Sequence, residues 1–371
     1  MRIAHIESSM HWGGQELRIV EQTEWLNNQG HPTWIIARPG SAIVERAREK
    51  SLPHYEMPIR GTSYPPTLIK LLDFLRGHKI ELLDCHSNRE SSYGAYVRWL
   101  MQIPVIRSRH TIDPIRCDFY DRLLWRYGND GIIVTADEIR KMIVSLGLSK
   151  PDRIVVAEAG VDKARFHPGI CGLSLRRQLG IPEHHFVIAN IGMIRPDKGQ
   201  LQFVTACRSL LKKHAELTCI QIGEAPSHSL AYKDKVLAHA GEDGHNGRIR
   251  FMGYQSDIEN WLALADIVVI ASISTEAKTR LVAQAFLMKK NVVATTIGGL
   301  KEMIAHNHTG LLCPPDDPAA LAQAVELLMS NKTLAKTLRD NAYLHAVRSM
   351  TFENMMEGMM DAYQQAIFAS N

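Results

Sequence analysis

The amino-acid sequence predicts an α/β protein built from two doubly wound parallel-sheet domains that face each other across a cleft. Three observations lead to this fold class. The chain has 371 residues, which is more than a single hydrophobic core usually supports. Short β-branched runs alternate with amphipathic helical stretches, as in a parallel sheet covered by helices. The alternation breaks once near the middle and then starts afresh, which indicates two separate sheets.

The first series of elements begins at the amino terminus. Apolar runs predict strands at 2–7, 33–37, 82–85, 105–108 and 132–135, and amphipathic runs predict helices that include 15–29 and 42–50. Between 158 and 183 the pattern loosens around Gly160, Pro168, Gly172 and Pro182. Such punctuation favours a linker between the domains.

The second series predicts strands at 187–191, 218–222, 249–251, 267–271, 292–294 and 310–313. We therefore expect one domain at 1–165 and another at 170–350, with a final helix at about 352–371 that packs back on the first domain. Ligands of open α/β sheets bind beyond the carboxyl ends of the strands, so two facing sheets would place them in the cleft.

Composition excludes several classes of protein. With 45% hydrophobic and 22% charged residues, the chain is typical of globular proteins, and it contains no apolar run of about 18 residues that would predict a membrane span. The formal net charge of +4 does not call for a nucleic-acid partner. Six scattered cysteines without a CxxC pair, and a first segment that reads as a strand instead of a signal peptide, predict a cytoplasmic protein.

The first candidate site is a glycine-containing turn. Gly13 and Gly14 stand between the first expected strand and the helix expected at 15–29. Glycine lets the backbone approach a ligand closely, and a helix amino terminus carries a positive dipole and free N–H groups. The turn suits a phosphate or a developing negative charge, although a Gly-Gly pair is equally typical of a plain tight turn.

A second turn follows the strand expected at 187–191 and carries Arg195 and Lys198. Arginine offers a bidentate fork for phosphate oxygens, and lysine offers a compact charge. We expect both side chains at the carboxyl edge of the second sheet, where they can hold a diphosphate without a metal. A solvated basic loop is the simpler alternative.

A third group of polar residues follows the strand expected at 267–271. Glu276 ends the run Ser-Ile-Ser-Thr-Glu, and Gln284 comes eight residues later. A carboxylate can accept hydrogen bonds from two sugar hydroxyls, and Gln284 can reach a ribose from the next helix. Gly298 and Gly299 then precede another expected helix, whose amino terminus can bind phosphate.

In this order and spacing, the motifs resemble the GT-B glycosyltransferases of family 4, a retaining and metal-independent group. The resemblance extends from WGGQE at 12–16 to GLLCPPDDP near 310–318 and includes Gly223 in the run Gly-Glu-Ala-Pro. It implies two Rossmann-like domains, the first binding the acceptor and the second the nucleotide sugar. The GGQE start and the run QAF at 284–286 are similar to transferases of bacterial lipopolysaccharide or other surface-polysaccharide assembly.

The resemblance also implies roles for single residues. Arg195 and Lys198 would neutralise the donor diphosphate, and Glu276 would contact the donor sugar. Gln284 takes the place of a second glutamate, which binds the ribose in relatives. His110, at the end of the strand expected at 105–108, matches the family histidine that contacts the transferring sugar, and a surface histidine is the alternative.

The implied reaction moves a hexose-like unit from a nucleoside diphosphate sugar to an acceptor hydroxyl and retains the anomeric configuration. The donor is a substrate, so no cofactor is expected. We also expect no required metal, because Asp316 and Asp317 come too late in the chain for an acidic pair beside the donor. His86, which follows Asp84 at another strand end, is expected at the same edge as His110.

Three departures from the family pattern bear on activity. Met193 stands where an arginine is usual, Gln284 replaces a glutamate, and Ala277 replaces a glycine. They leave open whether activity is weakened or retuned. The cations Lys278 and Arg280 beside the expected sugar pocket suggest an acidic or phosphorylated donor sugar or acceptor.

The acceptor is expected to be a glycan or a lipid-linked molecule. Segments 66–76 and 118–127 mix aromatic residues with cations, as in helices that lie on an anionic bilayer. Peripheral contact with the cytoplasmic face of the inner membrane is therefore one interpretation, and ordinary amphipathic core helices are the other.

Other functions remain open at this point. The first is a catalytically weakened GT-B protein that acts as a partner-binding subunit, and a second is a GT-B sugar-nucleotide epimerase or phosphorylase. A nicotinamide-dependent enzyme fits least, because no G-x-G-x-x-G with a later acidic residue follows the first strand.

Overall fold

The computed structural model describes all residues except 112, 159, 246, 275, 277, 278 and 371, and except the side chains of 245, 369 and 370. The chain divides into two compact units. Unit 1 comprises Met1–Glu158 and Met355–Asn371, and unit 2 comprises Ala159–Asn354. Unit 2 thus begins before residue 170, the start expected from the sequence.

Unit 1 is built on a seven-stranded sheet in the order β3-β2-β1-β4-β5-β6-β7. Its strands are β1 Ile3–Glu7, β2 Thr33–Ala37, β3 His54–Glu56, β4 Leu82–Cys85, β5 Val105–Arg109, β6 Gly131–Val134 and β7 Ile154–Val156. All pairings are parallel, and β1 pairs with both β2 and β4. The strand order therefore reverses between β1 and β4, which makes this the switch point of a doubly wound sheet.

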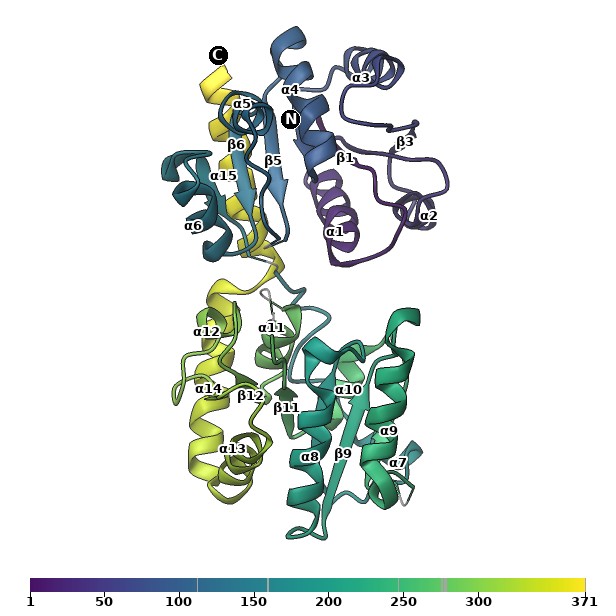
Figure 1. Ribbon diagram of the computed structural model, residues 1–371, viewed down its shortest axis with the longest axis vertical. Coiled ribbons are helices and arrows are strands. Elements are labelled where there is room, and N and C mark those ends of the chain that lie inside the picture. Colours follow the sequence, from purple (N-terminus) through teal and green to yellow (C-terminus); the bar gives the residue numbers. More distant parts are fainter. Residues whose placement is uncertain (112, 159, 246, 275, 277–278, 371) are drawn as a thin grey trace. The chain divides into compact units, whose positions relative to one another are not determined.

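Helices pack on the sheet of unit 1 (Figure 1). They are α1 Gly14–Asn28, α2 Ala42–Glu49, α3 Pro65–Gly77, α4 Asn88–Met101, α5 Phe119–Tyr127, α6 Asp137–Ser145 and α15 Phe352–Ser370. Helix α15 lies some two hundred residues beyond β7 in the chain, and from Met355 onward it belongs to this unit. Its Tyr363 is fully buried and donates a hydrogen bond to Asp84 of β4 over 2.6 Å.

Unit 2 has a six-stranded parallel sheet in the order β10-β9-β8-β11-β12-β13, with its switch point between β8 and β11. The strands are β8 Phe186–Ile191, β9 Leu217–Ile222, β10 Ile249–Phe251, β11 Ile267–Ile270, β12 Asn291–Thr295 and β13 Leu311–Cys313. The helices are α7 Leu173–Gln178, α8 Gln200–Leu211, α9 Leu230–His245, α10 Ile258–Leu264, α11 Arg280–Leu287, α12 Leu300–Met303, α13 Pro318–Ser330 and α14 Lys332–Ser349.

These two sheets confirm the predicted fold class, and each strand named from the sequence ends within one residue of its expected bounds. Strands β3 and β7 were not expected, because each has only three residues and β3 is polar and half-buried.

The predicted linker at 158–183 is wrong where it includes α7. The Arg176 guanidinium of α7 donates to the Leu264 carbonyl and forms an ion pair with Asp266 at 2.8 Å. A Cβ on Gly172 would lie 2.4 Å from the Leu264 nitrogen. These contacts pack the segment tightly into unit 2.

Candidate functional site

At the switch point of unit 2, residues from the ends of β8 and β11 meet. The Lys198 ammonium lies 2.7 Å from the Glu276 carboxylate, and the Ser272 hydroxyl donates to the same carboxylate oxygen. Glu276 is buried, whereas Lys198 is partly exposed. The structure therefore brings together two of the predicted residues that lie 78 positions apart in the chain.

Two glycines hold the loops of this site together. Gly199 has a φ of +68°, and a Cβ on it would lie 1.9 Å from the Ala271 carbonyl oxygen. Gly298 has a φ of +45°, and a Cβ there would lie 2.2 Å from the Glu276 carbonyl oxygen. That oxygen accepts a hydrogen bond from the Gly299 N–H over 3.0 Å. Gly298 and Gly299 thus fix the backbone of Glu276, a contact between loops that the sequence did not reveal.

Gly223 performs a similar role at the end of β9. A Cβ on it would lie 2.0 Å from the Gly192 carbonyl oxygen at the end of β8. The next turn is tied across as well, because the Ile194 N–H donates to the Glu224 carbonyl over 3.1 Å. Close backbone approach, which only glycine allows here, aligns the two strand ends.

Arg195 lies in the same turn as Lys198 but has a partner of its own. Its guanidinium contacts both carboxylate oxygens of Asp197 at 2.9 Å, so part of its charge is balanced within the turn. Met193 is exposed and contributes its carbonyl as an acceptor for the Gln200 amide.

Gln284 lies in α11 with a partly exposed side chain. Within the described residues, no hydrogen bond joins its amide to Glu276 or Lys198. The structure therefore does not bring Gln284, the residue predicted to bind the ribose, into hydrogen-bonding contact with these two side chains. Ala277 and Lys278 lie outside the described residues. Arg280 donates to the Gly160 carbonyl over 2.9 Å.

In unit 1, carboxylates surround the turn that contains Gly13 and Gly14. Glu7, the last residue of β1, accepts hydrogen bonds from the Ser9 N–H over 2.7 Å and from the Gln15 amide. A Cβ on Gly13 would lie 3.1 Å from a carboxylate oxygen of Glu16. A cation also lies beside the turn, because Arg89 donates to the Ser8 hydroxyl over 3.2 Å. Phosphate binding at Gly13 and Gly14 stays a prediction.

A second buried carboxylate, Glu90 of α4, lies in the same region. Both of its carboxylate oxygens are buried. Burial, followed by the nearby Glu7, raises the pKa of Glu90 to about 7, and burial also raises the pKa of Glu7. Sequence reasoning missed both residues, although a glutamate that ends an apolar strand was a usable signal.

His110 and His86, both expected at one edge of the sheet, are in direct contact. His86 Nδ1 lies 3.0 Å from His110 Nε2, and His86 Nε2 lies 2.9 Å from Nδ1 of His5 in β1. Burial lowers the pKa of His5 and that of His86 to about 3, and it lowers the pKa of His110 well below the usual value. The three rings are therefore neutral near pH 7. His5 was not expected, although a histidine inside the apolar run Ile-Ala-His-Ile was a signal.

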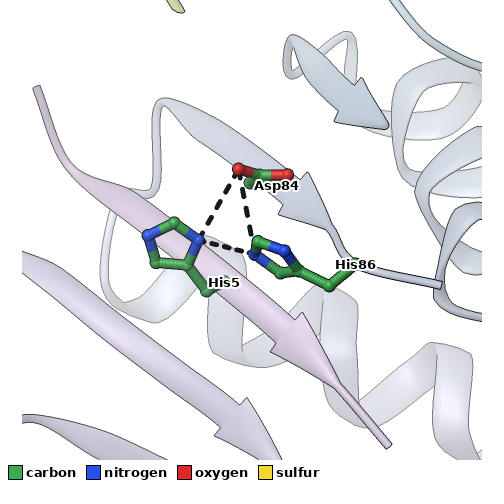
Figure 2. Close-up of side chains that lie close together, drawn as sticks. All are labelled: His5, Asp84 and His86. Carbon is green, nitrogen blue, oxygen red and sulfur yellow. Dashed lines mark hydrogen bonds and ion pairs between the residues drawn. The ribbon is translucent and has the colours of Figure 1, made fainter. Parts of the chain in front are cut away.

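Asp84 lies beside two of these imidazoles, those of His5 and His86 (Figure 2). One of its carboxylate oxygens accepts from Ser108 over 2.7 Å, and the other accepts from Tyr363 over 2.6 Å. The second oxygen also lies 3.7 Å from His5 Nδ1 and 3.8 Å from His86 Nε2.

The cluster of His5, Asp84 and His86 has donor atoms close enough together for a metal ion. It supplies three ligands, however, whereas structural zinc sites are almost always closed by four. The two nitrogens that would face the ion already share a hydrogen bond. We therefore interpret the cluster as a hydrogen-bonded network.

Comparison with known proteins places both units in one enzyme class. Residues 12–165 match the family described as Glycosyltransferase Family 4, and residues 174–345 match Glycosyl transferases group 1. The D-inositol 3-phosphate glycosyltransferase of Salinispora arenicola is 28% identical over 230 residues, 59% of this chain, and the match spans only 51% of that relative. The lipopolysaccharide core biosynthesis mannosyltransferase LpcC of Rhizobium leguminosarum bv. viciae is 27% identical, over 76% of this chain and 77% of its own length.

A solved structure supports the same fold. Anabaena Alr3699/HepE in complex with UDP superimposes with a TM-score of 0.84 at 20% sequence identity, over 98% of this chain and 100% of that one. The two family matches follow each other along the chain, the first almost entirely in unit 1 and the second within unit 2. The chain therefore belongs to the GT-B glycosyltransferases, with a family 4 domain followed by a group 1 domain.

Proposed function

We propose that this glycosyltransferase moves a sugar from a nucleoside diphosphate sugar to a glycan or lipid-linked acceptor in bacterial lipopolysaccharide or surface-polysaccharide assembly. Unit 2 binds the donor, and unit 1 binds the acceptor. The observation that carries the proposal is the Lys198–Glu276 pair at the switch point of unit 2, where a cation for phosphate and a carboxylate for sugar hydroxyls stand side by side.

In the proposed reaction, the bond between the anomeric carbon and the diphosphate breaks while the acceptor oxygen forms its bond on the same face of the sugar. The acceptor proton passes to the departing phosphate oxygen. Lys198 and Arg195 stabilise the negative charge that develops there, Glu276 accepts from sugar hydroxyls, and Gln284 accepts from the ribose. His110 of unit 1 contacts the transferring sugar.

We also propose that the reaction requires no metal, since two cations can balance the diphosphate. The acidic pair that could suggest otherwise has structural partners. Asp316 accepts from the Gln202 amide over 2.6 Å, and the Asp317 carboxylate caps the first turn of α13.

The relatives support the class of donor. Structures of Anabaena Alr3699/HepE are known with UDP and with UDP-glucose, and the relative from Rhizobium is a lipopolysaccharide mannosyltransferase by name. A nucleoside diphosphate sugar is the donor class that fits the two.

Calorimetric titration tests the donor site. UDP, GDP, ADP and CMP are titrated into the wild-type protein and into Lys198→Ala, with Lys336→Ala as the control because Lys336 is an exposed lysine of unit 2. One diphosphate should bind the wild type and Lys336→Ala equally. Lys198→Ala should bind it about ten to a hundred times more weakly, as expected for a lost hydrogen bond to a charged group.

Two outcomes would contradict the proposal. Undiminished binding to Lys198→Ala would place the diphosphate elsewhere. Failure of all four nucleotides to bind the wild type would favour the alternative that this chain is a weakened transferase acting as a partner-binding subunit.

A lipid-linked acceptor would be met at a membrane, and unit 1 has a surface that suits one. No helix of the described residues is long and apolar enough to cross a bilayer. Helices α4 and α5 pack against each other and expose Trp99, Leu100, Phe119 and Tyr127, with Phe119 84% exposed. Exposed cations around α5 are Arg116, Arg122 and Arg126. We propose that this surface, called the α4–α5 surface below, docks on the anionic cytoplasmic face of the inner membrane.

Vesicle flotation tests the α4–α5 surface. The wild type should float with vesicles of phosphatidylcholine and phosphatidylglycerol, and it should float less with phosphatidylcholine alone. Phe119→Ser should reduce flotation several-fold, whereas Phe368→Ser, a change at an equally exposed phenylalanine of unit 1, should not. If the wild-type protein floats with neither kind of vesicle, the proposed membrane docking is wrong.

A further inference from the structure

Three histidines, one inside a strand and two directly after neighbouring strands, form a continuous hydrogen-bonded row in unit 1. His5 belongs to β1, His86 follows β4 and His110 follows β5. The contacts between them are 2.9 Å and 3.0 Å long, and neighbouring ring centroids lie 5.1 Å and 5.3 Å apart. His5 and His86 are buried, whereas His110 is partly exposed. The row therefore leads from the core to the edge of the sheet.

Neutral imidazoles in such a row cannot choose their tautomers independently. Each neutral ring has one N–H donor and one acceptor nitrogen, and each of the two contacts needs one of each. Only two arrangements satisfy both contacts. Either all the N–H groups point from His5 toward His110, or all point from His110 toward His5.

The buried end of the row decides between the two arrangements. Nε2 of His5 is buried without a hydrogen-bond partner among the described residues. A buried N–H without an acceptor is rarer in proteins than an acceptor without a donor, so His5 should carry its proton on Nδ1. His5 then donates to His86, and His86 donates to His110 Nε2.

We propose that His5 and His86 are positioning residues that fix His110 as an Nδ1–H donor at the carboxyl end of β5. His110 then offers a hydrogen bond to an oxygen of the bound substrate and cannot act as a base through Nδ1. The identity of that oxygen, on the sugar or the phosphate, rests on the proposed function. The tautomer of His110 does not.

The test reads the tautomers directly. Two-bond proton–nitrogen NMR spectra of the full-length protein with ¹⁵N-labelled histidine, recorded at pH 7.5 without substrate, distinguish Nδ1–H from Nε2–H rings. The wild type should show His5, His86 and His110 as neutral Nδ1–H tautomers. His5→Leu removes the donor at the start of the row and should change the tautomer of His110. His5→Asn keeps an N–H near the Nδ1 position and should restore it.

Sugar transfer supplies a second readout. His5→Leu should lower kcat about tenfold and leave the affinity for the nucleoside diphosphate unchanged, and His5→Asn should recover most of the rate. An Nε2–H or charged His110 in the wild type would overturn the proposal, even if the variants do not fold. So would stoichiometric zinc bound in the purified protein whose removal shifts the His5 and His86 signals. If the wild type binds no nucleotide, that result would count against the proposed function alone.

Discussion

At the switch point of unit 2 a partly exposed lysine forms an ion pair with a buried glutamate, whereas at the switch point of unit 1 several titratable side chains are buried and have pKa values that favour their uncharged forms. Lys198 and Glu276 pair between the ends of β8 and β11. In unit 1, burial shifts the pKa values of His5, His86 and Glu90 so that their uncharged forms are favoured. The same topology thus surrounds an ion pair in unit 2 and a cluster of mostly uncharged polar groups in unit 1.

The two regions also differ in what holds them together. In unit 2, glycines let one backbone lie directly against another, as Gly298 does against Glu276. In unit 1, side-chain hydrogen bonds connect the elements instead, because Asp84 of β4 accepts from Ser108 of β5 and from Tyr363 of α15. A side-chain atom added to a glycine should disrupt the backbone contacts of unit 2. The stability of the side-chain network of unit 1 should depend on pH.

The change with the largest expected effect disrupts the backbone contact between Gly298 and Glu276 in unit 2. Gly298→Ala should lower the free energy of unfolding by about 3 kcal/mol or more, because it places a Cβ against a carbonyl oxygen and strains a positive φ. Gly180→Ala is the matched control, since Gly180 has a φ of +61° but no atom within 4 Å of its Cβ position, and it should cost about 1 kcal/mol. Urea unfolding of the full chain measures both. If the free energy of unfolding falls equally in the two variants, the close contact with the Glu276 carbonyl is not the reason that position 298 requires glycine.

The second prediction concerns the buried carboxylate of unit 1. The pKa of Glu90 is raised from 4.5 to about 7, so the stability that its protonated form contributes is complete below about pH 4.5 and is lost as the pH rises through about 7. Glu90→Gln cannot ionise. Its stability relative to the wild type should therefore improve by about 2 kcal/mol between pH 5 and pH 8.

Urea unfolding at the two pH values measures this change. Glu45→Gln is the control, because Glu45 is an exposed glutamate of unit 1, and its effect should not depend on pH. If the relative stability of Glu90→Gln is the same at both pH values, Glu90 is ionised in the folded protein and the neutral character assigned to this region is wrong.

The sequence predicted which residues lie together at the switch point of unit 2 better than it did for unit 1, and the reason is physical. Lys198, Glu276 and Gly298 each lie in a loop directly after an apolar strand, and parallel strands bring all such loops to one edge. Local pattern was therefore enough to place them together. The contact between Gly298 and the Glu276 backbone was not predictable, because a glycine pair has the same pattern in any turn.

In unit 1 the network depends on partners far apart in the chain. Tyr363 reaches Asp84 from 279 residues away, and nothing in the run of methionines around it indicates a polar contact. Glu90 follows no strand directly and lies inside a helix. Its altered pKa arises from burial, which a single sequence does not report. The strands and helices themselves were predictable because the period of their apolar residues is local.

The change with the smallest expected effect concerns the proposed contact between Gln284 and the ribose. Gln284→Glu should tighten nucleoside diphosphate binding about threefold, because a carboxylate forms stronger hydrogen bonds with ribose hydroxyls than an amide does. Inorganic pyrophosphate is the control ligand, since it has no ribose, and its affinity should stay the same or fall through repulsion. Calorimetry of both ligands separates the two contributions. Weaker binding of the nucleotide itself would place Gln284 near the phosphates instead, and the charged site of unit 2 would then extend from Lys198 onto α11.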